Sequence, residues 1–383
     1  MKAYKEFVEY VRHIYNKPEG FISLHEPRFI GNEKKYVNEA IDSTFVSSVG
    51  KFVNDFELKI AQMTGAKYAV AIVNGTNALH LALVMAGVKS NEEVITQTLT
   101  FTATANAISY INAIPHFVDV DKETLGLSPT KLRIHLQEIA EIKNGQCYNK
   151  NSGNRIAACV PMHTFGLPIN MIELKSVCDE FRIPIVEDAA ESLGSFYNKQ
   201  HTGTFGLLGV ISFNGNKIVT SGGGGVIITN DEELAIKAKH LSTQAKKTHA
   251  WDFDHDAVGY NYRMPNLNAA LLCAQLEQLN NFVDNKREIW QKYNTFFMEN
   301  NFANLVPEID DAISNYWLNT ILLNSKNEQQ NFLQYTNDNH IMTRPIWKLM
   351  SSLEHFKYCP IANIENAIWL EDRVVNIPSS VIV

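Results

Sequence analysis

Residues 212–228 read SFNGNKIVTSGGGGVII and place a single lysine, Lys217, before four consecutive glycines. The apolar run ahead of it, GVISF (209–213), is expected to form a buried strand, and GGVIIT (224–229) another. An amine at the mouth of a core strand has two interpretations. It is either a surface lysine whose stem lies along apolar surface or a nucleophile whose pKa is lowered by burial.

Short apolar runs alternate with helical patterns through the first two-thirds of the chain. Alternating strands and helices imply parallel pairing, and runs that are apolar on both faces imply helices on both sides of the sheet. The sequence therefore predicts an α/β fold with a mostly parallel, seven-stranded sheet. Its expected strands are 67–73, 92–97, 115–121, 155–163, 184–190, 209–214 and 224–229.

The remaining third of the chain is mainly helical in pattern. Residues 267–301 keep a period of about 3.6 and predict one long helix that joins two domains. We expect a large α/β domain over 1–245, with an N-terminal amphipathic helix as an arm, and a smaller α+β domain over 246–383. The polar run 143–155 is expected to be a surface linker.

Composition limits the class of protein. The 383 residues are 45% hydrophobic and 20% charged, as in soluble globular proteins, and the net charge of −7 disfavours nucleic-acid or membrane-surface binding. Five scattered cysteines show no metal-ligand spacing, so no metal site is expected. The absence of a signal-peptide pattern and of an apolar run of ~20 residues predicts a cytoplasmic protein without a membrane span.

Polar residues follow several of the predicted strands, at the edge where open parallel sheets bind ligands. Gly75 and Thr76 precede a helix, where free N–H groups suit a phosphate, although Thr76 could simply be the helix N-cap. Asp188 follows strand residues 184–187, either as a helix cap or as a carboxylate that pairs with a buried cation.

Together these groups match the needs of one molecule, pyridoxal 5′-phosphate. It requires an amine for a Schiff base, a carboxylate opposite its ring nitrogen, a phosphate cup and a flat side chain against the ring. Phe101 could supply that face or be a core phenylalanine. A dinucleotide site on the four glycines is disfavoured, because they precede a strand instead of opening a helix.

Six ordered motifs resemble those of the DegT-like nucleotide-sugar aminotransferases, which are fold-type-I pyridoxal-phosphate enzymes. The resemblance extends over nearly the whole chain. The motifs are NGTNALHLAL (74–83), TFTATANAI (100–108), PMHTFGLPINM (161–171), EDAAESLGS (187–195), SFNGNKIVTSGGGG (212–225) and GYNYRMPNLNAA (259–270).

The resemblance implies a role for each matching residue. Lys217 resembles the lysine that forms the Schiff base and moves the proton between substrate and cofactor, and Asp188 resembles the partner of the ring nitrogen. Phe101 resembles the stacking aromatic. Asn261 resembles an asparagine that reaches the phosphate from the neighbouring subunit, which implies a homodimer. The remaining phosphate ligands would be Gly75, Thr76 and Ser212.

Two further residues have roles that the resemblance leaves open. Many relatives carry glutamine or histidine where this chain has Glu191, facing the phenolic oxygen of the cofactor. A carboxylate there would be repelled by a phenolate unless it were protonated or paired, so the cofactor contact of Glu191 is left open. His163 follows a predicted strand and is either a substrate-pocket residue or a core histidine.

The flanking segments resemble the branch that aminates C4 of UDP-linked 4-keto-6-deoxy-N-acetylhexosamines, with L-glutamate as donor, for bacterial surface polysaccharides. They are LHEPRFIGNEKKYV (24–37), DSTFVSSVGKFV (42–53), TRPIWKLM (343–350) and NAIWLEDRVVNIPSS (366–380). Basic residues in them are candidates for the UDP pyrophosphate or ordinary surface charges: Arg28, Lys34, Lys35 and Arg344.

Other activities are compatible with the same fold. One is an aminotransferase for the C3 ketone of a dTDP-linked sugar. A second is a sugar dehydratase, which is disfavoured because those relatives replace the lysine with histidine. A third is a non-enzymatic protein that binds UDP-sugars.

Overall fold

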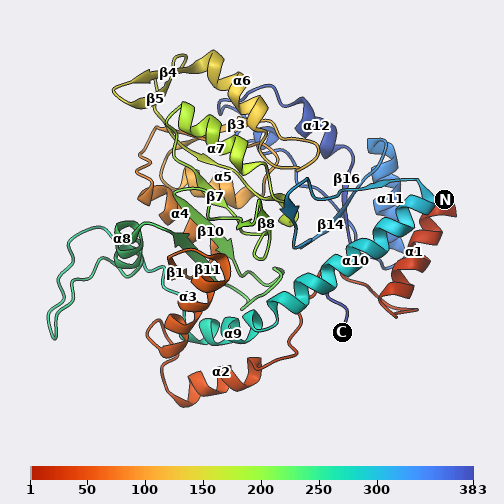
Figure 1. Cartoon of the computed structure of the whole chain (residues 1–383), viewed down its shortest axis with the longest axis horizontal. Coiled ribbons are helices and arrows are strands. Elements are labelled where there is room, and N and C mark those ends of the chain that lie inside the picture. The colour runs from red at the N-terminus through yellow and green to blue at the C-terminus, as the bar shows by residue number, and fades with distance from the viewer. Residues whose placement is uncertain (1) are drawn as a thin grey trace.

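The main sheet of the protein has seven strands in this computed structural model, which describes residues 2–383 (Figure 1). Bridges between Cys159 and Ile185 and between Met162 and Asp188 join its four-stranded and three-stranded parts. β11 runs antiparallel to both neighbours and the other strands run parallel, which confirms the predicted mostly parallel sheet. In spatial order the strands are β1 (Tyr68–Ile72), β11 (Gly225–Thr229), β10 (Leu208–Ser212), β7 (Val186–Asp188), β6 (Ile156–Val160), β2 (Glu93–Gln97) and β3 (Ile114–Val118).

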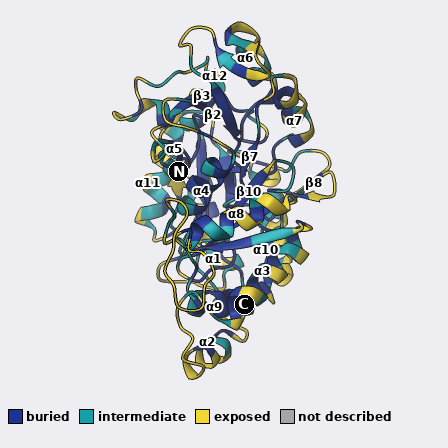
Figure 2. Ribbon diagram, turned by 90° about the vertical axis from the view of Figure 1, so that its left-hand side faces the viewer, coloured by how far each residue is buried: buried dark blue, intermediate teal, exposed yellow. Residues whose placement is uncertain are grey.

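Helices cover both faces of this sheet, as predicted from strands that are apolar on both faces. Neighbouring residues of one strand join different cores: Val210 packs with α4 (Gly75–Met85) and α8 (Glu232–Ser242), whereas Ile211 packs with α3 (Lys51–Thr64). Most strand residues are accordingly buried, while the outer helices are exposed on one side (Figure 2). The other covering helices are α5 (Thr102–Ser109), α6 (Pro129–Ile139) and α7 (Met171–Glu180).

The predicted long helix over 267–301 is interrupted, so that expectation is wrong. α9 (Asn266–Leu276) packs against α2 (Glu33–Asp42) and α3, whereas α10 (Leu279–Asn300) extends toward the C-terminal elements (Figure 1). Apolar residues at helical spacing continue across the break, although α9 is buried on most of its surface and only α10 has an exposed polar face. Leu279 and Phe282 at the start of α10 still share a core with α9, whereas its later residues pack into a second core beside α1.

The C-terminal part of the chain has its own antiparallel sheet. Its strands are, in spatial order, β12 (Asn304–Leu305), β14 (Asn319–Leu322), β16 (Val374–Ile377) and β15 (Arg344–Pro345). Phe7 and Val11 of α1 (Lys2–Ile14) pack into the core beside it, so α1 lies against elements on the far side of the predicted boundary at residue 245. That boundary stays a prediction. The elements here also include α11 (Lys326–Asp338) and α12 (Glu365–Glu371).

The expected linker 143–155 is largely structured, contrary to the prediction. β4 (Ala140–Lys143) and β5 (Gln146–Asn149) form a hairpin, and Asn149 and Ser152 donate hydrogen bonds to the buried carboxylate of Glu93. A polar run is ordered here because it satisfies a buried charge. The remaining short elements are η1 (Thr164–Gly166), β8 (Phe196–Tyr197), β9 (Gln200–His201), β13 (Ala312–Ile313) and η2 (Met350–Ser352).

Among residues 2–383, no helix combines the length and apolar character that crossing a bilayer requires.

Candidate active site

A cavity of about 540 Å³ opens at the carboxyl ends of β1, β7 and β10, the edge that the sequence indicates. Its wall brings together segments that lie far apart in the chain, including two tryptophans from the C-terminal part, Trp317 and Trp347. Seven of the predicted site residues line it: Gly75, Thr76, Phe101, Asp188, Glu191, Ser212 and Lys217.

The start of α4 provides free backbone donors to this cavity. Asn74 is extended and caps the helix, since its side chain accepts a hydrogen bond of 2.8 Å from the N–H of Asn77. Thr76 is therefore not the N-cap, and the N–H groups of Gly75 and Thr76 have no partner within the helix. A Cβ on Gly75 would lie 2.8 Å from Cβ of Ser212, so the two segments form a cradle that only glycine permits.

Asp188 lies at the end of β7 with its side chain buried. Thr104 Oγ1 donates a hydrogen bond of 2.7 Å to one carboxylate oxygen, and the N–H of Ala190 donates one of 3.1 Å to the other. Burial raises the pKa of Asp188, and these hydrogen bonds and the charge of Lys217 oppose that rise. The site thus holds a desolvated carboxylate that a cationic group in the cavity would stabilise as an anion.

Lys217 forms an ion pair with Glu191. Its Nζ lies 2.9 Å from Oε1 of Glu191, whose other oxygen accepts a hydrogen bond of 2.9 Å from the N–H of Phe165. Only 12% of the lysine side chain and 2% of the glutamate side chain are exposed. Burial raises the pKa of Glu191, whereas the pairing with Lys217 opposes that rise. Glu191, which stands where many relatives carry glutamine or histidine, is therefore the ion-pair partner of the Lys217 amine.

Aromatic side chains form much of the remaining wall. Nζ of Lys217 lies 4.0 Å from the ring centroid of Trp317, and Phe101 stands half-exposed at the cavity, 5.9 Å from the ring of Trp347. Neither tryptophan is among the site residues that the sequence predicts. Trp347 lies in the segment TRPIWKLM (343–350), whose only predicted role is its resemblance to enzymes that act on UDP-linked sugars. No local pattern indicates Trp317.

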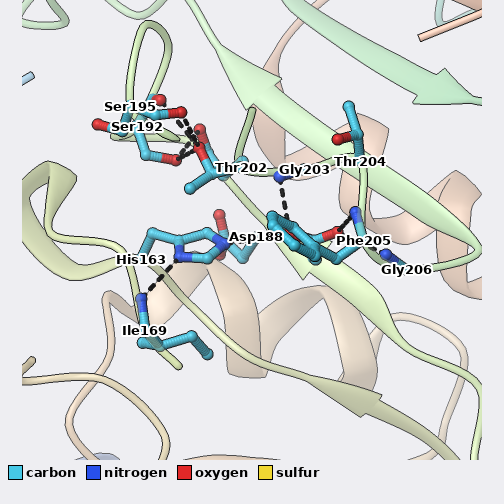
Figure 3. A network of polar contacts seen from close by, with 12 residues as sticks. His163, Ile169, Asp188, Ser192, Ser195, Thr202, Gly203, Thr204, Phe205 and Gly206 are labelled. Atoms are coloured by element: carbon cyan, nitrogen blue, oxygen red, sulfur yellow. Dashed lines mark hydrogen bonds and ion pairs between the residues drawn. The ribbon is translucent and has the colours of Figure 1, made fainter. Parts of the chain in front are cut away.

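His163 belongs to the core and does not line the cavity, so the structure favours the core alternative for this residue. Its Nε2 lies 3.2 Å from a carboxylate oxygen of the buried Glu187, and its Nδ1 accepts a hydrogen bond of 3.3 Å from Ile169 (Figure 3). The carboxylate of Glu187 also accepts backbone hydrogen bonds from Gly203, Phe205 and Gly206. With its partners satisfied, this network is structural.

The predicted substrate-binding cations also lie outside the cavity wall. Arg28 donates to the carbonyl of Val381 and pairs with Glu26, and Arg344 is exposed in β15. Lys34 and Lys35 lie on α2, away from the lining residues. Asn261 is exposed, forms an isolated bridge with Thr243 just after α8, and is not among the residues that line the cavity of its own chain. A long loop projects from the molecule beside α8 (Figure 1).

Comparison with known proteins adds to this geometry. The model of the DegT/DnrJ/EryC1/StrS aminotransferase family matches residues 27–382. The chain belongs to this family. That membership confirms the predicted enzyme class and cofactor: the protein is a pyridoxal-phosphate-dependent sugar aminotransferase.

The similarity of this aminotransferase to curated relatives extends over most of both chains. A putative pyridoxal phosphate-dependent aminotransferase, EpsN, of Bacillus subtilis (strain 168) is 38% identical over 85% of this chain and 81% of its own. A GDP-perosamine synthase of Escherichia coli O157:H7 is 36% identical over 94% of this chain and 93% of its own. The structure of the aminotransferase TlmJ from Streptoalloteichus hindustanus has the same fold, with a TM-score of 0.85, 24% identity and 94% of each chain covered.

The residues of the aminotransferase cavity fit pyridoxal phosphate. The cradle between Gly75 and Ser212 at the start of α4 suits a phosphate, and the buried Asp188 suits a protonated ring nitrogen. Lys217 is the one cationic side chain among the residues that line the cavity.

Proposed function

We propose that this aminotransferase moves the amino group of L-glutamate to the C4 ketone of a UDP-linked 4-keto-6-deoxy-N-acetylhexosamine. The observation that carries the proposal is the meeting of the Lys217 amine, the Asp188 carboxylate and the free N–H groups of α4 in one cavity. The choice of sugar is supported by the flanking segments 24–37, 42–53, 343–350 and 366–380, which resemble the branch that acts on UDP-sugars.

The predicted site residues that line the cavity then have defined tasks. Pyridoxal phosphate, when bound, supplies an aldehyde for amine exchange and a ring that withdraws electrons. Lys217 holds the cofactor and moves the proton that creates the new amine, and Asp188 keeps the ring nitrogen protonated. Phe101 covers the ring, while the phosphate is held by Gly75, Thr76 and Ser212.

Glu191 changes its protonation state in this scheme. In the structure its carboxylate is balanced by the ammonium of Lys217, 2.9 Å away. When Lys217 is bonded to the cofactor, the buried carboxylate loses this partner, and burial then favours the neutral acid. A neutral Glu191 would not repel the phenolic oxygen of the cofactor as a carboxylate would. Glu191→Gln should therefore retain the cofactor, and Glu191→Ala should weaken its binding.

The proposed enzyme is a homodimer in which Asn261 completes the neighbouring active site. Two observations support this arrangement. Asn261 does not line the cavity of its own chain, and large apolar side chains are exposed at Val49, Trp251 and Phe253, with 62%, 82% and 77% of their surface accessible.

The substrate is tested with a panel of UDP-, GDP- and dTDP-linked ketosugars, incubated with nitrogen-15-labelled L-glutamate and analysed by mass spectrometry. We expect labelled nitrogen in the UDP-linked 4-keto-6-deoxy-N-acetylhexosamine. Amination of GDP-linked sugars alone, the outcome that the relatives named GDP-perosamine synthase favour, would contradict the nucleotide assignment. Amination at C3 would contradict the regiochemistry.

A Lys217→Ala variant is the control for the mechanism. It should lose the yellow absorbance of the lysine-bound cofactor together with turnover. Deoxygenation of a sugar without transfer of labelled nitrogen would indicate the dehydratase reaction instead.

A further inference from the structure

The ammonium group of Lys217 has two partners, one charged and one aromatic. Glu191 supplies the negative charge at 2.9 Å, and the indole of Trp317 offers its ring face at 4.0 Å from Nζ to the centroid. A cation over a tryptophan face is stabilised by the ring quadrupole, and more strongly so where water is excluded. Trp317 is only 4% exposed, so the contact lies in such a place.

Trp317 is itself held at three points. Its backbone N–H donates to Oδ1 of Asn315 at 2.8 Å, and its indole N–H donates to the carbonyl of Asn216 at 2.7 Å. Its own carbonyl accepts a hydrogen bond of 3.0 Å from Nζ of Lys286. Because Asn216 directly precedes Lys217, the indole fixes both the backbone at the lysine and the resting position of its amine.

The residues behind Trp317 connect it to the other partner of the amine. Asn315 donates a hydrogen bond of 2.9 Å to the carbonyl of Glu191. Lys286 of α10 is fully buried, and its hydrogen-bond acceptors are the carbonyls of Trp317 and Ser379. A buried amine without a carboxylate partner is costly, so its two carbonyl contacts hold the 315–317 segment in place. The C-terminal part of the chain thus determines where the Lys217 amine rests.

We propose that Trp317 is a positioning residue that stabilises the ammonium of Lys217 whenever this lysine is not bonded to the cofactor, and so favours its release. The inference rests on the role proposed for Lys217. To form the bond, the ammonium loses a proton to Glu191, its nitrogen joins the aldehyde carbon as C=N, and the aldehyde oxygen leaves as water. Bonding therefore ends the cation–ring contact, and release restores it.

The test compares two probes on cofactor-stripped protein by isothermal titration calorimetry. Pyridoxal phosphate can bond to Lys217, whereas pyridoxamine phosphate uses the same cradle but has no aldehyde. Removing the ring in Trp317→Leu should raise the affinity for pyridoxal phosphate relative to pyridoxamine phosphate about 10-fold. Trp317→Phe keeps an aromatic face and should leave this ratio within about threefold of the wild-type value. Trp317→Met also removes the ring, but its flexible side chain can fill the space differently, so it serves if the leucine variant does not fold.

A purely structural role for Trp317 gives a different result. Both affinities would then fall together, the ratio would not change, and the proposal would be overturned. It would also be overturned if the phenylalanine variant shifted the ratio as much as the leucine variant. Lys217→Ala separates this inference from the proposed function: should that variant still form the yellow cofactor adduct, Lys217 is not the bonding lysine and the proposed function fails first.

Discussion

Asp188 illustrates at the residue scale how burial and a few hydrogen bonds prepare one carboxylate for one task. Asp188→Asn keeps the shape but cannot hold a proton on the ring nitrogen, so we expect kcat to fall by roughly 100-fold or more. Thr104→Val is the matched control, because it removes only one hydrogen bond to the same carboxylate. It should raise the activation free energy by only about 1–2 kcal/mol. Steady-state kinetics with both variants check this, and an asparagine variant of wild-type rate would contradict the assignment.

The position of His163 cannot be predicted from the residues around it in the sequence. A histidine at the end of a strand is compatible with a substrate pocket and with the core, and nothing within its own motif distinguishes the two. The buried Glu187 that pairs with it lies 24 positions away, and this carboxylate is satisfied by backbone groups from a third segment. Local sequence does not specify such a partner.

At the scale of elements, the four glycines after Lys217 have unequal roles. A Cβ on Gly225 would lie 2.5 Å from the backbone of Asn74, whereas one on Gly223 would approach no atom closer than 3.6 Å. Gly225→Ala should therefore displace the start of α4, weaken cofactor binding and destabilise the fold by a few kcal/mol. Gly223→Ala is the control and should stay near wild type. Cofactor titration and urea unfolding measure both effects, and equal behaviour of the two variants would contradict this reading.

The β8–β9 hairpin makes stability depend on pH through His201. Its buried ring accepts a hydrogen bond of 2.8 Å from Gly194, and burial lowers the pKa of His201 from 6.5 to about 4. Between these values only the unfolded chain binds the proton, so the free energy of unfolding should fall by up to about 3 kcal/mol as the pH drops from 6.5 to 4. Urea unfolding at several pH values measures this slope. His201→Gln should flatten it, and an unchanged slope would refute the role of His201.

At the scale of the whole molecule, the proposed exchange of Asn261 between subunits can be tested by mixing inactive chains. Lys217→Ala and Asn261→Ala should each be weak alone. Refolded together at equal amounts, they should recover about a quarter of wild-type activity, since half of the dimers are hybrids with one intact site. Lys217→Ala mixed with Asp188→Asn is the control and should recover nothing, because both residues line the same cavity of one chain. No recovery in the test pair, as in the control, would place Asn261 in its own site.

The sequence by itself determined the layered α/β fold, the seven strands of the main sheet and the cavity edge that carries Gly75, Asp188, Ser212 and Lys217. These follow from local properties, namely the period of apolar residues and the polar residues that end each strand. Only the tertiary structure decided the bend between α9 and α10, the core position of His163 and the contact of Trp317 with the amine. Each of these depends on which distant segments meet in space, and the period of a segment carries no information about its partner.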